Sequence, residues 1–173
     1  MTEVYKISKK EYPLVPLRGY WPMPSTLLSF DIQRNISRSA LEVAKGENTN
    51  LVLVNQKDVF NESPSKDELY DYGIVVSIKD TYDLPNSQTR VFVSPLAIGK
   101  IEKIKVVDGY FKAKVTEYTY DEQLEEDTDE LTALKKMIVE GFKNYAKLDP
   151  NIMEEVSYGL MEITNYHTII DLI

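Results

Sequence analysis

The sequence predicts an α+β protein in which a mostly antiparallel, barrel-like β domain is followed by a helical region. Up to residue 120, six or so short β-rich runs follow one another at intervals of about 8–15 residues, with one short helix near the start. At about residue 121 the apolar period becomes helical. We therefore expect two parts, a β lobe over residues 1–120 and an acidic, α-helical subdomain over residues 121–173.

The composition indicates a folded, cytoplasmic protein. Of the 173 residues, 43% are hydrophobic and 28% are charged, which is typical of globular domains. No apolar run approaches the ~20 residues that span a bilayer, and residues 1–12 lack the long apolar stretch of a signal peptide. The absence of cysteine excludes disulfides and thiolate chemistry. We expect a cytoplasmic location and no membrane partner.

The negative charge is concentrated in one segment. The net charge of −8 argues against a nucleic-acid partner bound by phosphate neutralisation. The segment DEQLEEDTDE (121–130) has seven acidic residues and no basic one, so it supplies nearly all of that charge. Two interpretations stay open: an extended hinge kept apart by like-charge repulsion, or a first helical turn whose dipole favours acidic side chains.

The stretch PLVPLRGYWPMP (13–24) contains four prolines and the only tryptophan. Residues 11–17 and 26–32 around it have the pattern of strands. Proline fixes φ and has no N–H to donate to a strand ladder. The prolines therefore predict that this region is an edge strand or a connecting loop; they are Pro13, Pro16, Pro22 and Pro24.

The middle of the chain alternates between strands and turns. Asn35 is a plausible N-cap for a helix over 36–45 that Gly46 ends. Asp108–Gly109 predicts a two-residue hairpin. The expected strands on either side of these signals cover residues 50–56, 72–82, 90–97, 100–107 and 110–120.

The last part of the sequence has helical spacing. Asp127, with Glu130 at the capping-box position, predicts the start of a helix that ends at Asp149–Pro150. Shorter helices are expected after it, and the chain stops in an apolar pattern, which favours a piece of a longer protein. The expected apolar stripe of the first helix is Leu131, Leu134, Ile138, Phe142 and Tyr145.

The residue inventory contains no recognisable catalytic constellation. There is no phosphate-binding G-x-x-x-x-G-K-[ST] loop and no G-x-G-x-x-G array. The single histidine, His167, cannot build an ordinary zinc site without cysteines, and the acidic segment lacks the ligand spacing of a calcium loop. We identify no catalytic residue, no metal site and no cofactor site in this chain.

Several stretches are similar in order and spacing to one known family. PLVPLRGYWPMP matches its Pro-Leu-Arg strand and aromatic-Pro element, and DELYDYGIVVSI matches an acidic Leu-Tyr-x-x-Gly signature through Leu69, Tyr70 and Gly73. NLVLVNQKD and ALKKMIVEGFKNYAKLDPNI match the strand before that signature and a helical segment after it. Together these stretches resemble the amino-terminal domain of Lon, the ATP-dependent protease.

The resemblance implies a PUA-like β pseudobarrel followed by a helical bundle. It also implies that the chain captures unfolded or damaged proteins and helps to assemble a homohexamer of Lon subunits. ATP and Mg²⁺ would be bound by a separate AAA+ motor module, and a Ser-Lys peptidase module would cleave the substrate. On this interpretation, the candidate substrate-binding residues are Tyr20, Trp21, Pro22 and Met23, because rigid prolines present large apolar side chains there. The alternative is that Trp21 plugs one end of the β lobe.

Two rival functions stay open at this point. One is a stand-alone binding or adaptor protein with the same β fold and no attached protease. The other is a small hydrolase, which would need a nucleophile with a base or a metal cluster. A phosphate-binding loop encoded after codon 173 would exclude the first, and hydrolysis of peptides or esters would support the second.

Overall fold

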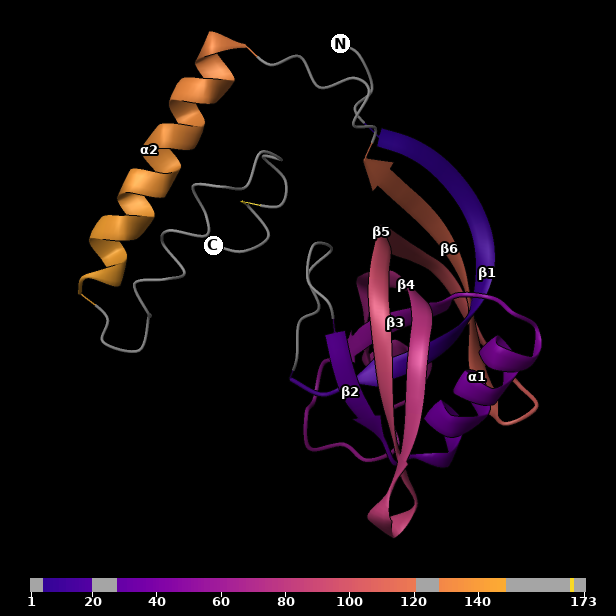
Figure 1. The fold of residues 1–173 in the computed structure, drawn as a ribbon. Coiled ribbons are helices and arrows are strands. Elements are labelled where there is room, and N and C mark those ends of the chain that lie inside the picture. Colours follow the sequence, from indigo (N-terminus) through magenta and orange to yellow (C-terminus); the bar gives the residue numbers. More distant parts are fainter. Residues whose placement is uncertain (1–4, 20–27, 121–127, 149–168, 170–173) are drawn as a thin grey trace. The chain divides into compact units, whose positions relative to one another are not determined.

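The computed structural model describes residues 5–19, 28–120, 128–148 and 169 (Figure 1). The chain divides into two compact units, Met1–Asp121 and Glu122–Ile173. The first unit is mostly β-sheet with one α-helix, so the prediction of a β-rich chain with a few helices is confirmed. Its elements are β1 (Tyr5–Leu17), β2 (Leu28–Ile32), α1 (Asn35–Gly46), β3 (Leu51–Gln56), η1 (Lys66–Glu68), β4 (Leu69–Leu84), η2 (Pro85–Ser87), β5 (Gln88–Val107) and β6 (Tyr110–Tyr120).

The six strands form one sheet whose pairings close into a ring. The strand order is β2-β5-β4-β3-β1-β6, and β5 also pairs with β6. Five of the strands are thereby paired on both sides, while β2 pairs with β5. All pairings are antiparallel except that of β1 with β3.

Ring closure depends on β5, which is one strand where the sequence predicts two. Its first half pairs with β2 and β4, and its second half pairs with β6. Gly99 lies at the changeover, opposite Gly73 of β4 on one side and Glu117 of β6 on the other. Register shifts in the β4 and β6 pairings bend β5 without a turn. Because of these bulges, one continuous strand takes the place of the two strands that the sequence pattern predicts.

At Gly73 and Gly99, neighbouring strands approach the backbone very closely. A Cβ at Gly73 would lie 2.2 Å from the Leu53 carbonyl oxygen, and one at Gly99 would lie 2.7 Å from Cγ1 of Val115. The contact at Gly73 is with backbone, which cannot move aside as a side-chain end can. Gly73 is the glycine of the Leu-Tyr-x-x-Gly signature, so that motif has a steric cause here.

The expectation that the prolines place this segment at an edge or in a loop is wrong for β1, which is an inner strand. Its first part pairs with β6 as far as Leu14, and its last part, from Leu14 to Leu17, pairs with β3. Pro13 therefore pairs only with β6 and Pro16 only with β3. Each proline has one strand neighbour, so its missing N–H breaks no ladder on a second side.

The core consists of two hydrophobic clusters on opposite faces of the sheet. All six residues of β3 are buried, and they alternate between the clusters: Leu51 and Leu53 belong to one, Val52 and Val54 to the other. Helix α1 contributes Ala40, Leu41 and Ala44 to the first cluster, as its predicted apolar side requires. A strand that is buried on both faces explains the continuous apolar run LVLV.

Of two local sequence predictions in the first unit, the hairpin turn is confirmed and the helix N-cap is wrong by one residue. Asp108 and Gly109 have φ values of 45° and 81°, the conformation of the predicted two-residue hairpin. Helix α1 begins at Asn35, so the N-cap is Arg34 and not Asn35, and no side chain caps it.

The second unit is described mainly by α2 (Asp129–Ala146). Its N-cap is Thr128, whose hydroxyl accepts a hydrogen bond from the Leu131 N–H at 3.2 Å, so the expected cap at Asp127 is wrong by one residue. Much of the predicted apolar stripe is exposed, with Leu134, Ile138 and Tyr145 at 47%, 40% and 56%. Within the described residues, no helix is long and apolar enough to cross a membrane.

We predict that Gly73→Ala lowers the free energy of unfolding by at least about 2 kcal/mol, because the new methyl group overlaps backbone. Urea denaturation measures the change. Gly46→Ala is the matched control, since nothing lies within 4 Å of a Cβ there. Equal stability of Gly73→Ala and Gly46→Ala would contradict the close passage of β3 and β4.

Candidate functional site

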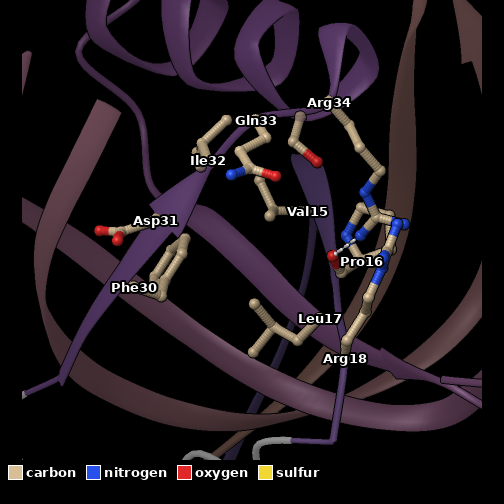
Figure 2. Close-up of a pocket in the computed structure, with 10 residues that line it drawn as sticks. Val15, Pro16, Leu17, Arg18, Phe30, Asp31, Ile32, Gln33 and Arg34 are labelled. Atoms are coloured by element: carbon tan, nitrogen blue, oxygen red, sulfur yellow. Dashed lines mark hydrogen bonds between the residues drawn. The ribbon is translucent and has the colours of Figure 1, made fainter. Parts of the chain in front are cut away.

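A cavity of about 220 Å³ lies between the end of β1, the strand β2 and the start of α1 (Figure 2). We call it the β1–β2 cavity. It exists because these two strands pair with other strands and not with each other at this point: β1 with β3 beyond Leu14, and β2 with β5. Its lining residues are Val15, Pro16, Leu17, Arg18, Phe30, Asp31, Ile32, Gln33, Arg34 and Ser37.

The floor of the cavity is apolar. Val15, Leu17 and Ile32 are almost completely buried and belong to the first core cluster, against which Phe30 packs. The floor is therefore held rigidly by the core, and apolar surface of a bound group could be covered there without rearranging the sheet.

The rim of the cavity carries an excess of positive charge. Arg18 and Arg34 both line it. The carboxylate of Asp31 also lines it but is engaged by Arg90 through two hydrogen bonds of 2.7 and 2.9 Å. Among the described residues, Arg18 has one acidic partner, the exposed Glu62 at 3.9 Å, whereas Arg34 forms no ion pair and feels the Glu62 charge from a greater distance. The rim thus has unbalanced cationic groups beside an apolar floor.

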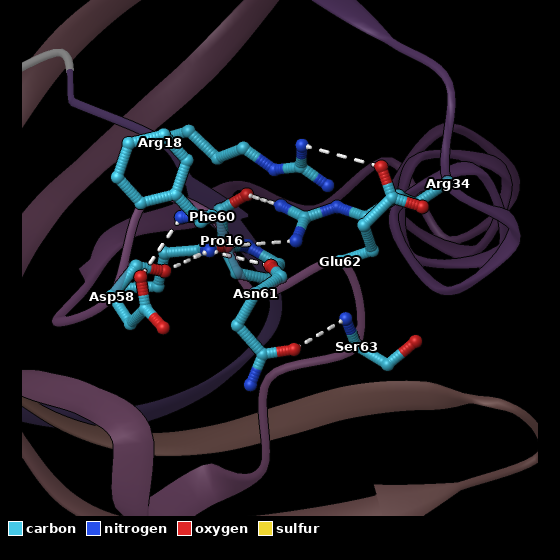
Figure 3. Close-up of polar contacts among 9 residues, drawn as sticks. Pro16, Arg18, Arg34, Asp58, Phe60, Asn61, Glu62 and Ser63 are labelled. Atoms are coloured by element: carbon cyan, nitrogen blue, oxygen red, sulfur yellow. Dashed lines mark hydrogen bonds and ion pairs between the residues drawn. The ribbon is translucent and has the colours of Figure 1, made fainter.

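Arg34 is held in place by neutral acceptors. Its guanidinium donates hydrogen bonds to the Pro16 carbonyl and, at 2.8 Å, to Oε1 of Gln56 (Figures 2 and 3). Burial lowers the pKa of Arg34, the positive charge of Arg18 lowers it further, and Glu62 opposes this. Arg34 stays charged despite this shift, because the ordinary arginine pKa is far above neutrality.

Gln56 connects this cavity to the loop that follows β3. Its buried amide nitrogen donates to the carbonyls of Asp58 and Asn61 at 2.5 and 2.7 Å. Within the loop, the Asp58 carboxylate accepts from the Phe60 N–H, and the Asn61 side chain accepts from the Ser63 N–H, both at 2.9 Å (Figure 3). We call residues 58–63 the Gln56 loop. These bonds give the loop a defined shape.

The defined loop presents an unburied aromatic ring. Phe60 is 87% exposed, and its neighbour Val59 is 40% exposed. A Cβ built on Gly19 would lie 3.7 Å from Cγ1 of Val59, so the chain leaves β1 directly beside this loop. The Phe60 ring therefore contributes little to the core, and its apolar surface is accessible to a partner.

A second polar cluster lies at Glu117 of β6. Its carboxylate, 6% exposed, accepts hydrogen bonds from the hydroxyls of Ser8 and Tyr12 and is 2.9 Å from the Lys10 ammonium group. Burial raises the pKa of Glu117, but the hydrogen bonds from Ser8, Tyr12 and Lys10 lower it more, so the net shift is downward. All these donors come from β1, which indicates that the cluster fixes the β1–β6 pairing.

Asn55 and Gln56, adjacent residues of β3, differ in the hydrogen bonding of their side-chain amides. Both are buried at the end of β3, but the side-chain amide of Asn55 has no hydrogen-bond partner for its oxygen or its nitrogen. An unsatisfied buried amide costs about 1–3 kcal/mol. Nothing in the structure explains why an amide stands at Asn55.

Among the described residues, no group of three His, Asp or Glu side chains could hold a metal ion.

One family model matches most of the chain. The model of the ATP-dependent protease La (LON) substrate-binding domain matches residues 11–173. This chain belongs to that family. The resemblance of the sequence to the Lon amino-terminal domain is therefore confirmed.

Relatives named Lon protease match along the whole chain. The protein of Clostridioides difficile (strain 630) is 31% identical over 175 residues, covering 100% of this chain and 22% of the relative. The protein of Finegoldia magna is 30% identical over 174 residues, with the same coverage of both chains. The chain thus spans about a fifth of the length of the curated relatives it matches.

Two solved structures show the same fold. The N-terminal domain of Mycobacterium avium complex Lon protease has a TM-score of 0.64 at 16% identity, covering 94% of this chain and 80% of that one. The Lon N-terminal domain protein from Xanthomonas campestris has a TM-score of 0.56 at 12% identity, covering 90% and 92%. At these identities the likeness concerns the fold alone.

The predicted binding residues Tyr20, Trp21, Pro22 and Met23 lie outside the described residues. The structure adds two groups that sequence reasoning missed, the exposed Phe60 and the cationic rim of the cavity. The sequence did contain a signal for Phe60, because this phenylalanine stands directly before the polar stretch NESPSKDE. No comparable signal joins Arg34 to Gln56, which are distant in sequence.

We predict that Glu117→Gln lowers the free energy of unfolding at pH 7 by about 1–3 kcal/mol, because Lys10 loses its partner and two hydroxyls lose a charged acceptor. The folded pKa of Glu117 is depressed, so the carboxylate stabilises the fold above its unfolded pKa of about 4.3 and loses this effect as the pH falls through the folded pKa.

The difference between wild type and Glu117→Gln should therefore shrink in acid. Urea denaturation at neutral pH and below about pH 4 measures it. Glu42→Gln, at an exposed position of α1, serves as the control and should change little. A wild-type advantage that persists unchanged into acid would contradict the role of the ionised carboxylate.

Proposed function

We propose that this chain captures unfolded or damaged proteins for a Lon-type ATP-dependent protease. The family membership supports a substrate-binding role, and the Phe60 ring, 87% exposed on a loop held by Gln56, supports capture through apolar contact. Unfolded proteins expose apolar segments that folded proteins bury, so such a surface selects them. The proposed capture surface consists of Tyr20, Trp21, Pro22 and Met23 together with Val59 and Phe60.

Weak single contacts suit this role. A buried aromatic side chain contributes roughly 2–3 kcal/mol, so two or three contacts give a Kd of about millimolar to micromolar per copy. Six copies in a hexamer could raise the avidity by ~10²-fold. A protease that inspects many proteins then releases most of them and retains those that offer several segments.

Within this chain, we propose that residues 1–120 form a PUA-like pseudobarrel and that residues 121–173 begin a helical bundle. Outside it, ATP and Mg²⁺ would be bound by an AAA+ module, and a Ser-Lys peptidase module would cleave the substrate. The proposed setting is the cytoplasm, without membrane or nucleic-acid partners. A coding sequence that lacks a phosphate-binding loop after codon 173 would instead favour the stand-alone adaptor.

We predict that Phe60→Ala and Trp21→Ala each weaken binding of an unfolded protein by about 5–30-fold, the effect of losing one aromatic contact. Binding of a fluorescently labelled, permanently unfolded protein to the chain measures this. Phe60→Ala should leave the melting temperature nearly unchanged, because its ring makes few contacts within the fold.

Tyr82→Ala is the matched control, since Tyr82 is an exposed aromatic residue near the other end of β4. If all three variants bind the unfolded protein alike, the proposed capture surface is wrong. A large fall in the melting temperature of Trp21→Ala would assign Trp21 to the core.

We also propose that the exposed stripe of α2 contacts another Lon subunit. Leu134, Met137, Ile138 and Tyr145 of α2 follow helical spacing and are each at least 40% exposed, and Leu148, just after the helix, is 83% exposed. An amphipathic helix with an uncovered apolar face gains most by pairing with another apolar face. The exposure of this apolar stripe supports the proposal. The homohexamer that the family resemblance implies identifies the partner as another Lon subunit.

We predict that the 173-residue chain self-associates and that Met137→Glu weakens this about tenfold, because a charge enters the apolar contact. Sedimentation velocity over a range of concentrations measures it. Thr132→Glu introduces the same charge on a different face of α2 and should have little effect. Identical sedimentation of the two variants would contradict assembly through the stripe.

A further inference from the structure

We propose that the β1–β2 cavity binds the carboxyl-terminal residue of a polypeptide, with its free carboxylate at Arg18 and Arg34 and its apolar side chain on the cavity floor. This inference rests on the proposed function, because it assumes that the chain binds polypeptides. It adds a second, end-specific mode of recognition to the capture of internal apolar segments.

The charge of the cavity favours an anion. Two guanidinium groups line it, and the acidic group on its wall, Asp31, is already engaged by Arg90. Arg34 donates its hydrogen bonds to neutral acceptors, and the exposed Glu62 is the carboxylate that acts on its charge. Arginine binds carboxylates through paired, charge-assisted hydrogen bonds, so this rim fits a carboxylate in chemistry.

The start of α1 adds donors at the same place. Arg34 is the N-cap of this twelve-residue helix, and the first turn contains no acidic side chain to neutralise the helix dipole. Ser37 lies in that turn and lines the cavity. It is 3% exposed, and its backbone N–H donates to the Arg34 carbonyl at 3.1 Å. Its hydroxyl forms part of the cavity wall, where it can donate a hydrogen bond to a bound carboxylate.

The apolar floor decides between kinds of anion. Val15, Leu17, Phe30 and Ile32 lie beside the cationic rim in the same cavity. Inorganic phosphate would leave this surface uncovered, and an Asp or Glu side chain offers only one or two methylene groups to cover it. A carboxyl-terminal residue has both groups on one Cα. The volume of about 220 Å³ is below the usual range of small-molecule and cofactor pockets, which favours a single residue.

Glu62 is the internal competitor for this site. Its carboxylate lies 3.9 Å from the Arg18 guanidinium and is 85% exposed (Figure 3). An incoming carboxylate can therefore displace it at little cost, since exposed ion pairs are weak. Removal of the Glu62 charge should strengthen binding, which a general loss of folding could not imitate.

The test compares two forms of one labelled peptide on the full 173-residue chain by fluorescence anisotropy. The peptide ends in leucine, either as the free acid or as the amide. We expect the acid to bind about tenfold more tightly, because the amide lacks the charge that the guanidinium groups recognise. Arg18→Gln and Ser37→Ala should reduce this preference, and Glu62→Gln should increase it about twofold or more.

Arg38→Gln is the matched control, because it removes the same charge from α1 at a residue that lies outside this cavity and bonds the Ser87 carbonyl. Equal binding of acid and amide overturns the inference, as does a preference that survives in both cavity variants. Competition by inorganic phosphate as strong as that of the leucine peptide would show a general anion site and also overturn it.

The two proposals can fail separately. If the acid and amide peptides bind alike while Phe60→Ala still weakens binding of the unfolded protein, the inference is wrong and the proposed function stands. If the acid preference depends on the cavity while no unfolded protein binds, the cavity assignment stands and the proposed capture of internal segments is wrong.

Discussion

The close passage of β3, β4 and β5 at Gly73 and Gly99 is the constraint on which the fold depends. A side chain at Gly73 would collide with the Leu53 backbone, and Gly99 lies between two strands at once. Because nothing protrudes there, β5 can bend and change its neighbours from β4 to β6. The pairings then close into a ring, which buries β3 on both faces and leaves β2 as a strand beside β5.

The same closure creates the β1–β2 cavity. Each partner change in a closed ring leaves a short length of strand paired on one side only, and in β1 this length follows Leu14, where β1 pairs with β3 and no longer with β6. An open strand edge invites pairing with other chains. Here Pro16 has no N–H to offer and its carbonyl is occupied by Arg34. The edge is thus closed to strand addition, while the side chains around it still enclose a space.

Elements that depend on a few adjacent residues were predicted correctly from the sequence. Features that depend on the pairing of distant strands were not. The hairpin at Asp108–Gly109 and the apolar face of α1 follow from a few adjacent residues. The division of β5 into two strands was wrong because bulges, which depend on neighbouring strands, replace the expected turn. The prolines of β1 were assigned to an edge because their partner change at Leu14 cannot be read from one strand. Arg34 meets Gln56, and Glu117 meets Ser8, only after the sheet has formed, so neither site could be predicted.

The two polar clusters of the first unit differ in a way that separates structure from recognition. At Glu117, a buried carboxylate is surrounded by donors from Ser8, Tyr12 and Lys10, so its bonding capacity is used within the fold. At the cavity, the cations Arg18 and Arg34 face the exposed Glu62 as their acidic neighbour among the described residues. A satisfied cluster stabilises one strand pairing and gains nothing from a ligand. A cationic cluster above an apolar floor would gain stability from an anion that carries an apolar group, and this asymmetry supports the proposal of recognition at the cavity.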